Sequence, residues 1–142
     1  MSNQDHTHYL PAFGRLLLAT IFIMSGLGKL AAPAATIAYI GSTGAPLPII
    51  GYGLALLIEL GGGVLILVGY KARLTAFVMA LFCVVTALLF HHALGDQNQM
   101  IHFLKNIAMA GGFLQVTAFG AGTFSLDSRV ARNSSTRILK TT

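Results

Sequence analysis

Charged residues are scarce in this chain of 142 residues. They make up 9% of the sequence, against 55% hydrophobic residues, whereas soluble domains contain about 25% charged residues. This composition excludes an ordinary soluble globular protein. It predicts a single all-α domain embedded in a membrane, because backbone groups in lipid must find their hydrogen bonds within a helix.

Redox-active and metal-binding residues are also few. Cys83 is the single cysteine, so the chain alone cannot run dithiol–disulfide chemistry. His91, His92, Asp96 and His102 have spacings that match no metal-site signature, and we expect no metal there. A haem b held by His91 and His102 is the alternative, but we interpret both as histidines at helix ends. The scattered basic residues indicate no nucleic-acid partner.

Four apolar stretches stand out: residues 13–30, 47–69, 74–90 and 101–119. Each approaches the roughly 20 residues that a membrane-spanning helix needs. The connections between them are short, which favours antiparallel neighbours. We therefore predict an integral membrane four-helix bundle over residues 13–127. Residues 1–12 would be an N-terminal cytoplasmic tail, and residues 128–142 a basic, disordered cytoplasmic tail.

The segment between the first two spans predicts one further helix. Pro33 suits the first turn of a helix, residues 34–40 are helix-compatible, and Tyr39 suits a membrane interface. We expect a short interfacial helix there. No Lys or Arg precedes Arg15, so the first span is interpreted as an uncleaved anchor and not as a signal peptide.

Basic residues predict the orientation in the membrane. Four spans put both termini on one side, and that side would carry seven basic residues, Arg15, Lys71, Arg73, Arg129, Arg132, Arg137 and Lys140. The other side would carry Lys29 and Lys105. The excess predicts a multi-pass protein of a bacterial-type inner (plasma) membrane with both termini cytoplasmic.

Glu59 is the most informative residue, because residues 31–69 contain no other charge. A carboxylate in hydrocarbon is a functional-site hypothesis by default. Counting about 1.5 Å per residue puts Glu59 near mid-membrane and Lys105 roughly one turn inside the outer surface. We expect Lys105 to pair with Glu59, and Lys29 and Arg15 are the alternatives.

Helical spacing predicts which face of each span points inward. Small and polar residues gather on one face, where they allow close helix packing. We interpret the run Gly61-Gly62-Gly63 in the same way. The predicted inward residues are Arg15, Ala19, Phe22, Ser25 and Lys29; Tyr52, Ala55, Glu59, Gly62 and Ile66; Arg73, Ala76, Ala80, Cys83, Ala87 and His91; and His102, Lys105, Met109 and Gly112.

Several segments, in this order and spacing, resemble the DoxX family of small four-span membrane proteins. They are residues 15–19, 22–30, 59–63, 69–73, 90–92, 102–108 and 125–127, so the resemblance covers about 13–127. The family is named after a subunit of a thiosulfate:quinone oxidoreductase, which implies a membrane redox role. The residues that match its recurring polar positions are Lys29, Glu59, His102, Lys105 and Asn106.

The residues and the resemblance together predict a polar pocket open to the outer face, formed by Ser25, Lys29, Glu59, His102, Lys105 and Asn106. It would bind a quinone or a small sulfur anion as part of a redox assembly. No catalytic residue is assigned, so such a subunit would take electrons from the quinone or from a redox partner protein. Two alternatives remain: a non-catalytic scaffold in the lipid bilayer whose buried charges fix helix packing, and a small-solute transporter that would need a homo-oligomer.

Overall fold

The regular elements of this computed structural model, which describes residues 8–139, are all helices. They are α2 (Leu10–Ala31), α3 (Pro33–Ser42), α4 (Pro48–Leu56), η1 (Leu57–Gly62), α5 (Gly63–Val68), α6 (Ala72–Phe90), α7 (Gln97–Phe119) and α8 (Leu126–Leu139). Each predicted apolar stretch coincides with one helical rod, and the short helix predicted after the first stretch is α3. The all-α prediction is therefore confirmed for the described residues.

Local chemistry explains where these helices begin and end. Prolines stand in the first turns of α2, α3 and α4, where a missing N–H is harmless. The backbone turns left-handed at Gly69, with φ 68°, which ends α5. Asp96 caps α7 by accepting a hydrogen bond from Gln99 N at 2.9 Å. That cap explains why α7 starts at Gln97, four residues before the predicted stretch.

The second rod is continuous but irregular. The chain runs from α4 through η1 into α5 without leaving helical geometry. The middle segment, η1, is a π-helix, in which the turn widens by one residue. Such segments are frequent at functional sites, and this one contains Glu59.

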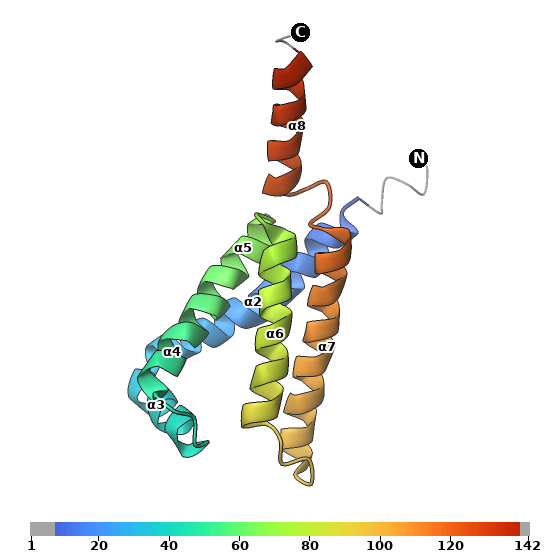
Figure 1. Cartoon of the computed structure of the whole chain (residues 1–142). Coiled ribbons are helices and arrows are strands. Elements are labelled where there is room, and N and C mark those ends of the chain that lie inside the picture. The colour runs from blue at the N-terminus through green and yellow to red at the C-terminus, as the bar shows by residue number, and fades with distance from the viewer. Residues whose placement is uncertain (1–7, 140–142) are drawn as a thin grey trace.

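The helices form two pairs (Figure 1). α2 packs along α4, η1 and α5, whereas α6 packs along α7 over most of its length. The pairs meet where α6 contacts α5 and η1 and where α7 contacts α2, and they separate toward α3. This divergence positions the cavity described below.

The core lies where the two pairs meet. Its buried residues are Ala19, Phe22, Ile66, Ala76, Met79, Ala80, Cys83, Ala110 and Phe113. The predicted inward face of α6 is correct from Ala76 to Ala87. The predicted face of α7 is wrong, because Asn106, Ala110 and Phe113 are buried while Lys105 is exposed. The buried face of α7 is thus offset by one residue, about 100° of helix rotation.

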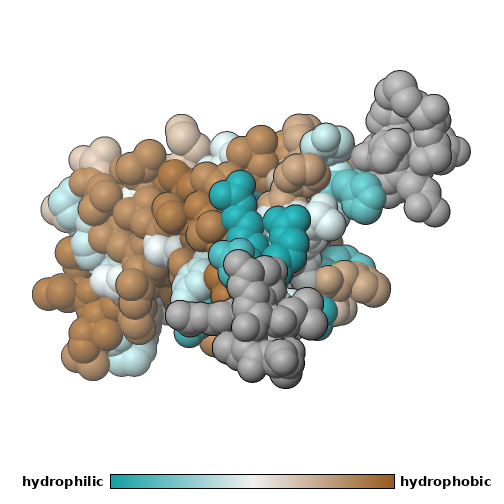
Figure 2. All heavy atoms as spheres, turned by 90° about the horizontal axis from the view of Figure 1, so that it is seen from above, coloured by the Kyte–Doolittle hydropathy of each residue, from teal (hydrophilic) through white to brown (hydrophobic). Residues whose placement is uncertain are grey.

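The outer surface of the helices is apolar. Large exposed hydrophobic side chains occur on α2, α4, α6 and α7, and Figure 2 shows hydrophobic residues over much of the visible surface. Among the described residues, three helical rods are long and apolar enough to cross a membrane: α2, Pro48–Val68 and α6. α7 is 23 residues long but more polar, and it is not one of the three.

The C-terminal segment differs from the prediction. We expected residues 128–142 to be disordered, yet the chain up to Leu139 forms α8, which extends away from the bundle in Figure 1. The start of α8 is held by Asp127, whose carboxylate accepts hydrogen bonds from Lys71 N at 2.7 Å and Ala72 N at 2.9 Å. A contact of this kind, 55 residues away along the chain, is invisible to sequence spacing. Residues 140–142 lie outside the described residues.

Candidate functional site

Glu59 is a buried carboxylate in the π-helical segment η1. Its side chain is only 6% exposed. The second rod packs closely against α2 on one side of this π-helical segment and against α6 on the other. A Cβ on Gly63 would lie 2.8 Å from Ile23 Cγ1, and a Cβ on Gly62 would lie 3.0 Å from Met79 Sδ. The interpretation of the glycine run as close helix packing is therefore confirmed for Gly62 and Gly63, whereas a Cβ on Gly61 would meet only Leu57 Cδ1 of the same rod, at 3.8 Å.

Lys29 is the partner of Glu59. Its ammonium lies 2.8 Å from Glu59 Oε1 and 2.9 Å from Oε2. It also donates to Ser25 Oγ at 2.8 Å, and Ser25 Oγ in turn donates to Glu59 Oε1 at 3.3 Å. An ammonium has three N–H donors, so these bonds use all of them. Lys29, Glu59 and Ser25 form a closed polar cluster between α2 and η1.

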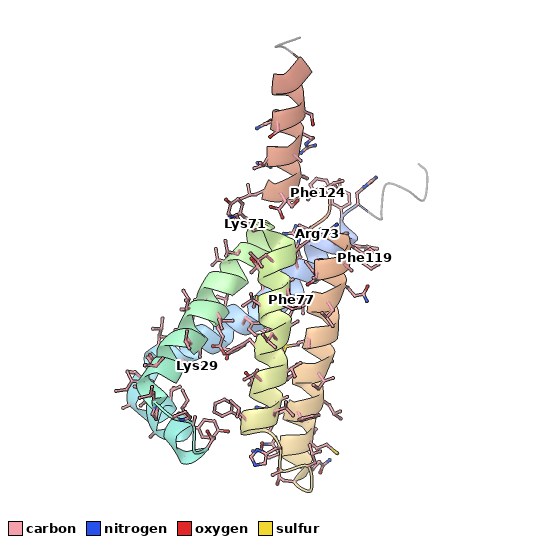
Figure 3. The ribbon with its side chains drawn as sticks, viewed as in Figure 1. Lys29, Lys71, Arg73, Phe77, Phe119 and Phe124 are labelled. Atoms are coloured by element: carbon pink, nitrogen blue, oxygen red, sulfur yellow. The ribbon has the colours of Figure 1, made fainter. Side chains whose placement is uncertain are left out.

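The prediction that Lys105 pairs with Glu59 is therefore wrong. Lys105 Nζ instead lies 3.1 Å from His102 Nδ1, one turn earlier on α7. The reason is that α2, and not α7, is the helix in contact with η1. α2 packs directly against η1, whereas α7 packs mainly against α6. Figure 3 shows Lys29 in the half of the bundle that contains α3, far from Lys71 and Arg73 at the other end.

A cavity of about 550 Å³ lies between the two helix pairs. Ser25, Lys29 and Glu59 line it from one side, and Lys105 and Asn106 line it from α7. Five of the six predicted ligand-binding residues thus border one space. The sixth, His102, is not part of the lining and reaches the cavity only through its contact with Lys105.

Most of the cavity wall is apolar, and the sequence did not predict this. α6 contributes Val78, Leu81, Phe82, Val85 and Leu89, and α4 contributes Leu54 and Ala55. On α6 these residues belong to the side that faces away from the predicted inward stripe. Only the separation of the two helix pairs brings them to the cavity.

His91 and His102 lie side by side at the α3 end of the bundle. Their rings are stacked with centroids 5.0 Å apart, and His91 Nδ1 is 2.9 Å from Gln99 Oε1. Two axial haem ligands must direct ring nitrogens at an iron between them. Stacked rings do not have that arrangement, so these two residues do not fit a haem site in this conformation.

Comparison with known proteins gives the family. The DoxX family profile matches residues 10–92, more than half of the chain. The chain belongs to the DoxX family. This DoxX-family chain is 37% identical over 116 residues to the inner membrane protein YqjF of Escherichia coli K12, covering 80% of this chain and 85% of YqjF. It is 34% identical over 120 residues to the inner membrane protein YphA of the same organism, covering 81% and 86%. No solved structure matches it.

Family membership and the apolar helices together identify an integral membrane protein. The segment matched by the DoxX profile contains the closed polar cluster of Ser25, Lys29 and Glu59, and all of the α6 wall. It ends before α7, and therefore before Lys105 and Asn106.

A second polar site of this DoxX-family chain lies at the other end of the bundle. Arg15 is 2% exposed and donates from Nη1 to Ile66 O and Leu67 O, each at 2.9 Å, and from Nη2 to Phe124 O. Two of these bonds reach carbonyls in the last turn of α5, where Ile66 O also accepts from Gly69 N at 3.2 Å, and the third ties in the segment before α8. Arg15 was predicted to point inward, and it does, but it lies far along the bundle from Glu59 and serves the helix junction.

Proposed function

We propose that this protein binds the headgroup of a quinone in the cavity between the two helix pairs, as a subunit of a redox assembly in the bacterial inner membrane. The observation that carries the proposal is the composition of that cavity. Its wall is mostly apolar, Lys29 and Glu59 form an ion pair on one side, and Lys105 lies opposite them outside that pair. The redox assignment rests on the resemblance to a thiosulfate:quinone oxidoreductase subunit.

The proposal includes a four-span bundle with α7 as the fourth span. At about 1.5 Å per residue, the 23 residues of α7 reach about 34 Å, enough for the ~30 Å hydrocarbon layer. Its charged residue and most of its polar residues, including Lys105 and Asn106, belong to the first three turns, where cavity and interface can hydrate them, and Gln115 and Thr117 lie near the opposite end. Four spans put both termini on the side with the larger number of basic residues, the cytoplasm.

Lys105 is the residue that we expect to contact the ligand. Lys29 has no N–H left, because all three donate within the closed polar cluster. Lys105 contacts the His102 ring and lines the cavity. A quinone carbonyl is an acceptor, and a hydrogen bond from an ammonium is about twice as strong as a neutral one. Lys105 is therefore suited to hold such a carbonyl and to stabilise negative charge on it after reduction.

A small sulfur anion fits the cavity less well. Such an anion is strongly hydrated, and moving it against an apolar wall costs hydration that one ammonium does not replace. A quinone, which is an apolar ring with polar carbonyls, loses far less hydration free energy when it enters the cavity. We therefore favour the quinone and treat the sulfur anion as an outcome of the test.

The test is a thermal-shift measurement on the purified protein in detergent. Benzoquinone and naphthoquinone analogues should raise the melting temperature of the wild type. The shift should disappear in Lys105→Gln and persist in Lys71→Gln, a matched change at an exposed lysine at the opposite end. A shift with thiosulfate alone would reassign the site to a sulfur anion, and no shift with either ligand class would contradict the proposal.

A non-catalytic scaffold is the second candidate, because one observation favours it. The closed polar cluster joins α2 to η1 with every Lys29 donor used, as expected of charges that fix helix register. A scaffold predicts that Glu59→Gln lowers expression or melting temperature while co-purifying partners are retained. It also predicts that Lys105→Gln changes neither, which separates it from the quinone proposal.

A further inference from the structure

We infer that the ligand of this cavity enters from the bilayer between α4 and α6, and that it is a quinone with an apolar tail and not a tailless one. This inference rests on the proposed function and adds the route and the class of ligand. It follows from the unequal chemistry of the cavity walls and from the way the helices close around them.

The charged groups of the cavity lie on different helices from its largest apolar wall, which α6 provides. The charged and amide groups come from α2, η1 and α7, namely Lys29, Glu59, Lys105 and Asn106. The residues that α4 contributes are apolar or glycine, and those of α6 are apolar except for Thr86. A ligand in this space therefore meets charged and amide groups on α2, η1 and α7 and mainly hydrocarbon on α4 and α6, which is the pattern expected for an amphiphile.

The apolar side is open to the surroundings. We define the lateral opening by Leu54 on α4 and by Leu81, Val85 and Leu89 on α6. These four residues line the cavity, yet they are 53%, 57%, 43% and 47% exposed. The helices diverge there, because α6 packs against η1 and α5 of the second rod, whereas α4 packs against α2 and α3. In a bilayer, the lateral opening faces acyl chains.

An aromatic pair lies across the end of the cavity toward α3. Tyr39 of α3 stacks on Phe90 at the end of α6, with ring centroids 5.7 Å apart, and both residues belong to the cavity wall. The contact joins the two helix pairs at the end where they are otherwise separated. A solute entering from this end would have to pass the aromatic pair, whereas a molecule entering through the lateral opening would not.

The lateral opening and the aromatic pair at the α3 end together define how the ligand lies. Its headgroup approaches Lys105, and its tail passes through the lateral opening into the lipid. Such a tail stays in hydrocarbon during binding, so the headgroup is the part that changes surroundings. The membrane also concentrates a tailed quinone at the opening.

The experiment compares two probes with one headgroup in nanodiscs: a dimethoxy-methyl-benzoquinone without a tail and its decyl derivative. Binding is measured by equilibrium dialysis, the uptake by empty nanodiscs is subtracted, and the affinity of each probe is expressed against its free aqueous concentration. Leu81→Trp narrows the lateral opening. Leu88→Trp is the matched control, because Leu88 lies on the same helix with 58% exposure but does not line the cavity.

We expect the decyl probe to bind at least ten-fold more tightly than the tailless one. Leu81→Trp should weaken the decyl probe at least five-fold and leave the tailless probe within two-fold, and Leu88→Trp should change neither. Equal affinity of both probes, unchanged by Leu81→Trp, would overturn the lateral route while leaving quinone binding intact. If neither probe binds the wild type, quinone binding itself is refuted and the lateral route is overturned with it.

Discussion

Lys29 binds both carboxylate oxygens of Glu59 from a helix that approaches η1 closely. The two residues are 30 positions apart, and the N–O distances are 2.8 and 2.9 Å. Gly26, one turn before Lys29, makes the approach possible, since a Cβ there would lie 2.6 Å from Leu60 Cδ2. The ion pair and the glycine contact therefore depend on the same helix interface.

Removal of Lys29 should destabilise the protein more than neutralisation of Glu59. Lys29→Met leaves a buried carboxylate without its cation. We expect a loss of about 2–3 kcal/mol of unfolding free energy, below the ~3–5 kcal/mol of a fully buried pair, because the Lys29 side chain is 26% exposed. Glu59→Gln leaves a lysine that can extend toward water, and should cost about 1 kcal/mol. Unfolding in mixed micelles, followed by circular dichroism because the chain has no tryptophan, measures both.

The double variant Lys29→Met/Glu59→Gln is the control for this pair. It removes both charges at once, so it should recover part of the stability that Lys29→Met loses. A larger loss in Glu59→Gln than in Lys29→Met would contradict this account of the site.

Two glycines of α2 should respond in opposite ways to alanine. At Gly26 the new methyl group would displace Leu60, and we expect a loss of about 1–3 kcal/mol, the usual effect of overpacking. At Gly28 a Cβ would meet nothing within 4 Å, so Ala should be neutral or stabilising by up to ~1 kcal/mol through helix propensity. The same micelle unfolding experiment compares them, and equal effects at both positions would argue against close packing of α2 on η1.

Arg15→Lys should destabilise the junction between α2, α5 and the segment before α8. The guanidinium reaches three carbonyls on two segments, and a single ammonium lacks that fork geometry. Since a hydrogen bond to a charged group contributes about 1.5–3 kcal/mol, we expect a loss of about 2–4 kcal/mol. Arg73→Lys, an exposed position at the same end, should change melting by little, and a similar loss there would point to a general charge effect.

Thiol labelling tests the proposed topology. Cys83 is fully buried, so background labelling of the native protein should be low. Asn98→Cys, in the first turn of α7, should react with a membrane-impermeant maleimide in intact cells. Thr123→Cys, after α7, should react only once the membrane is permeabilised. Labelling of both in intact cells would mean that α7 does not cross the membrane.

The sequence was enough to locate the important carboxylate and the apolar helices. Charge is so costly in hydrocarbon that one Glu in a long uncharged stretch is conspicuous. The requirement for internal backbone hydrogen bonding makes each apolar stretch a helix. The inward face of α6 was predictable for a related reason, since its small residues recur at helical spacing.

The depth of each residue in the membrane, counted along its helix, did not predict which lysine pairs with Glu59. Counting residues treats the helices as parallel rods, and it ranked Lys105 above Lys29. The structure brings α2 against η1 and separates α7 from it. The one-residue offset on α7 has the same origin, because its buried face is set by packing against α6.

Composition and period thus determined that this chain is helical, apolar outside and charged at a few positions within. Which lysine reaches Glu59, where the π-turn falls, and how α4 and α6 part to open a cavity were decided only in the assembled fold. Those features depend on side chains distant in the chain fitting together, and a linear pattern does not contain that fit.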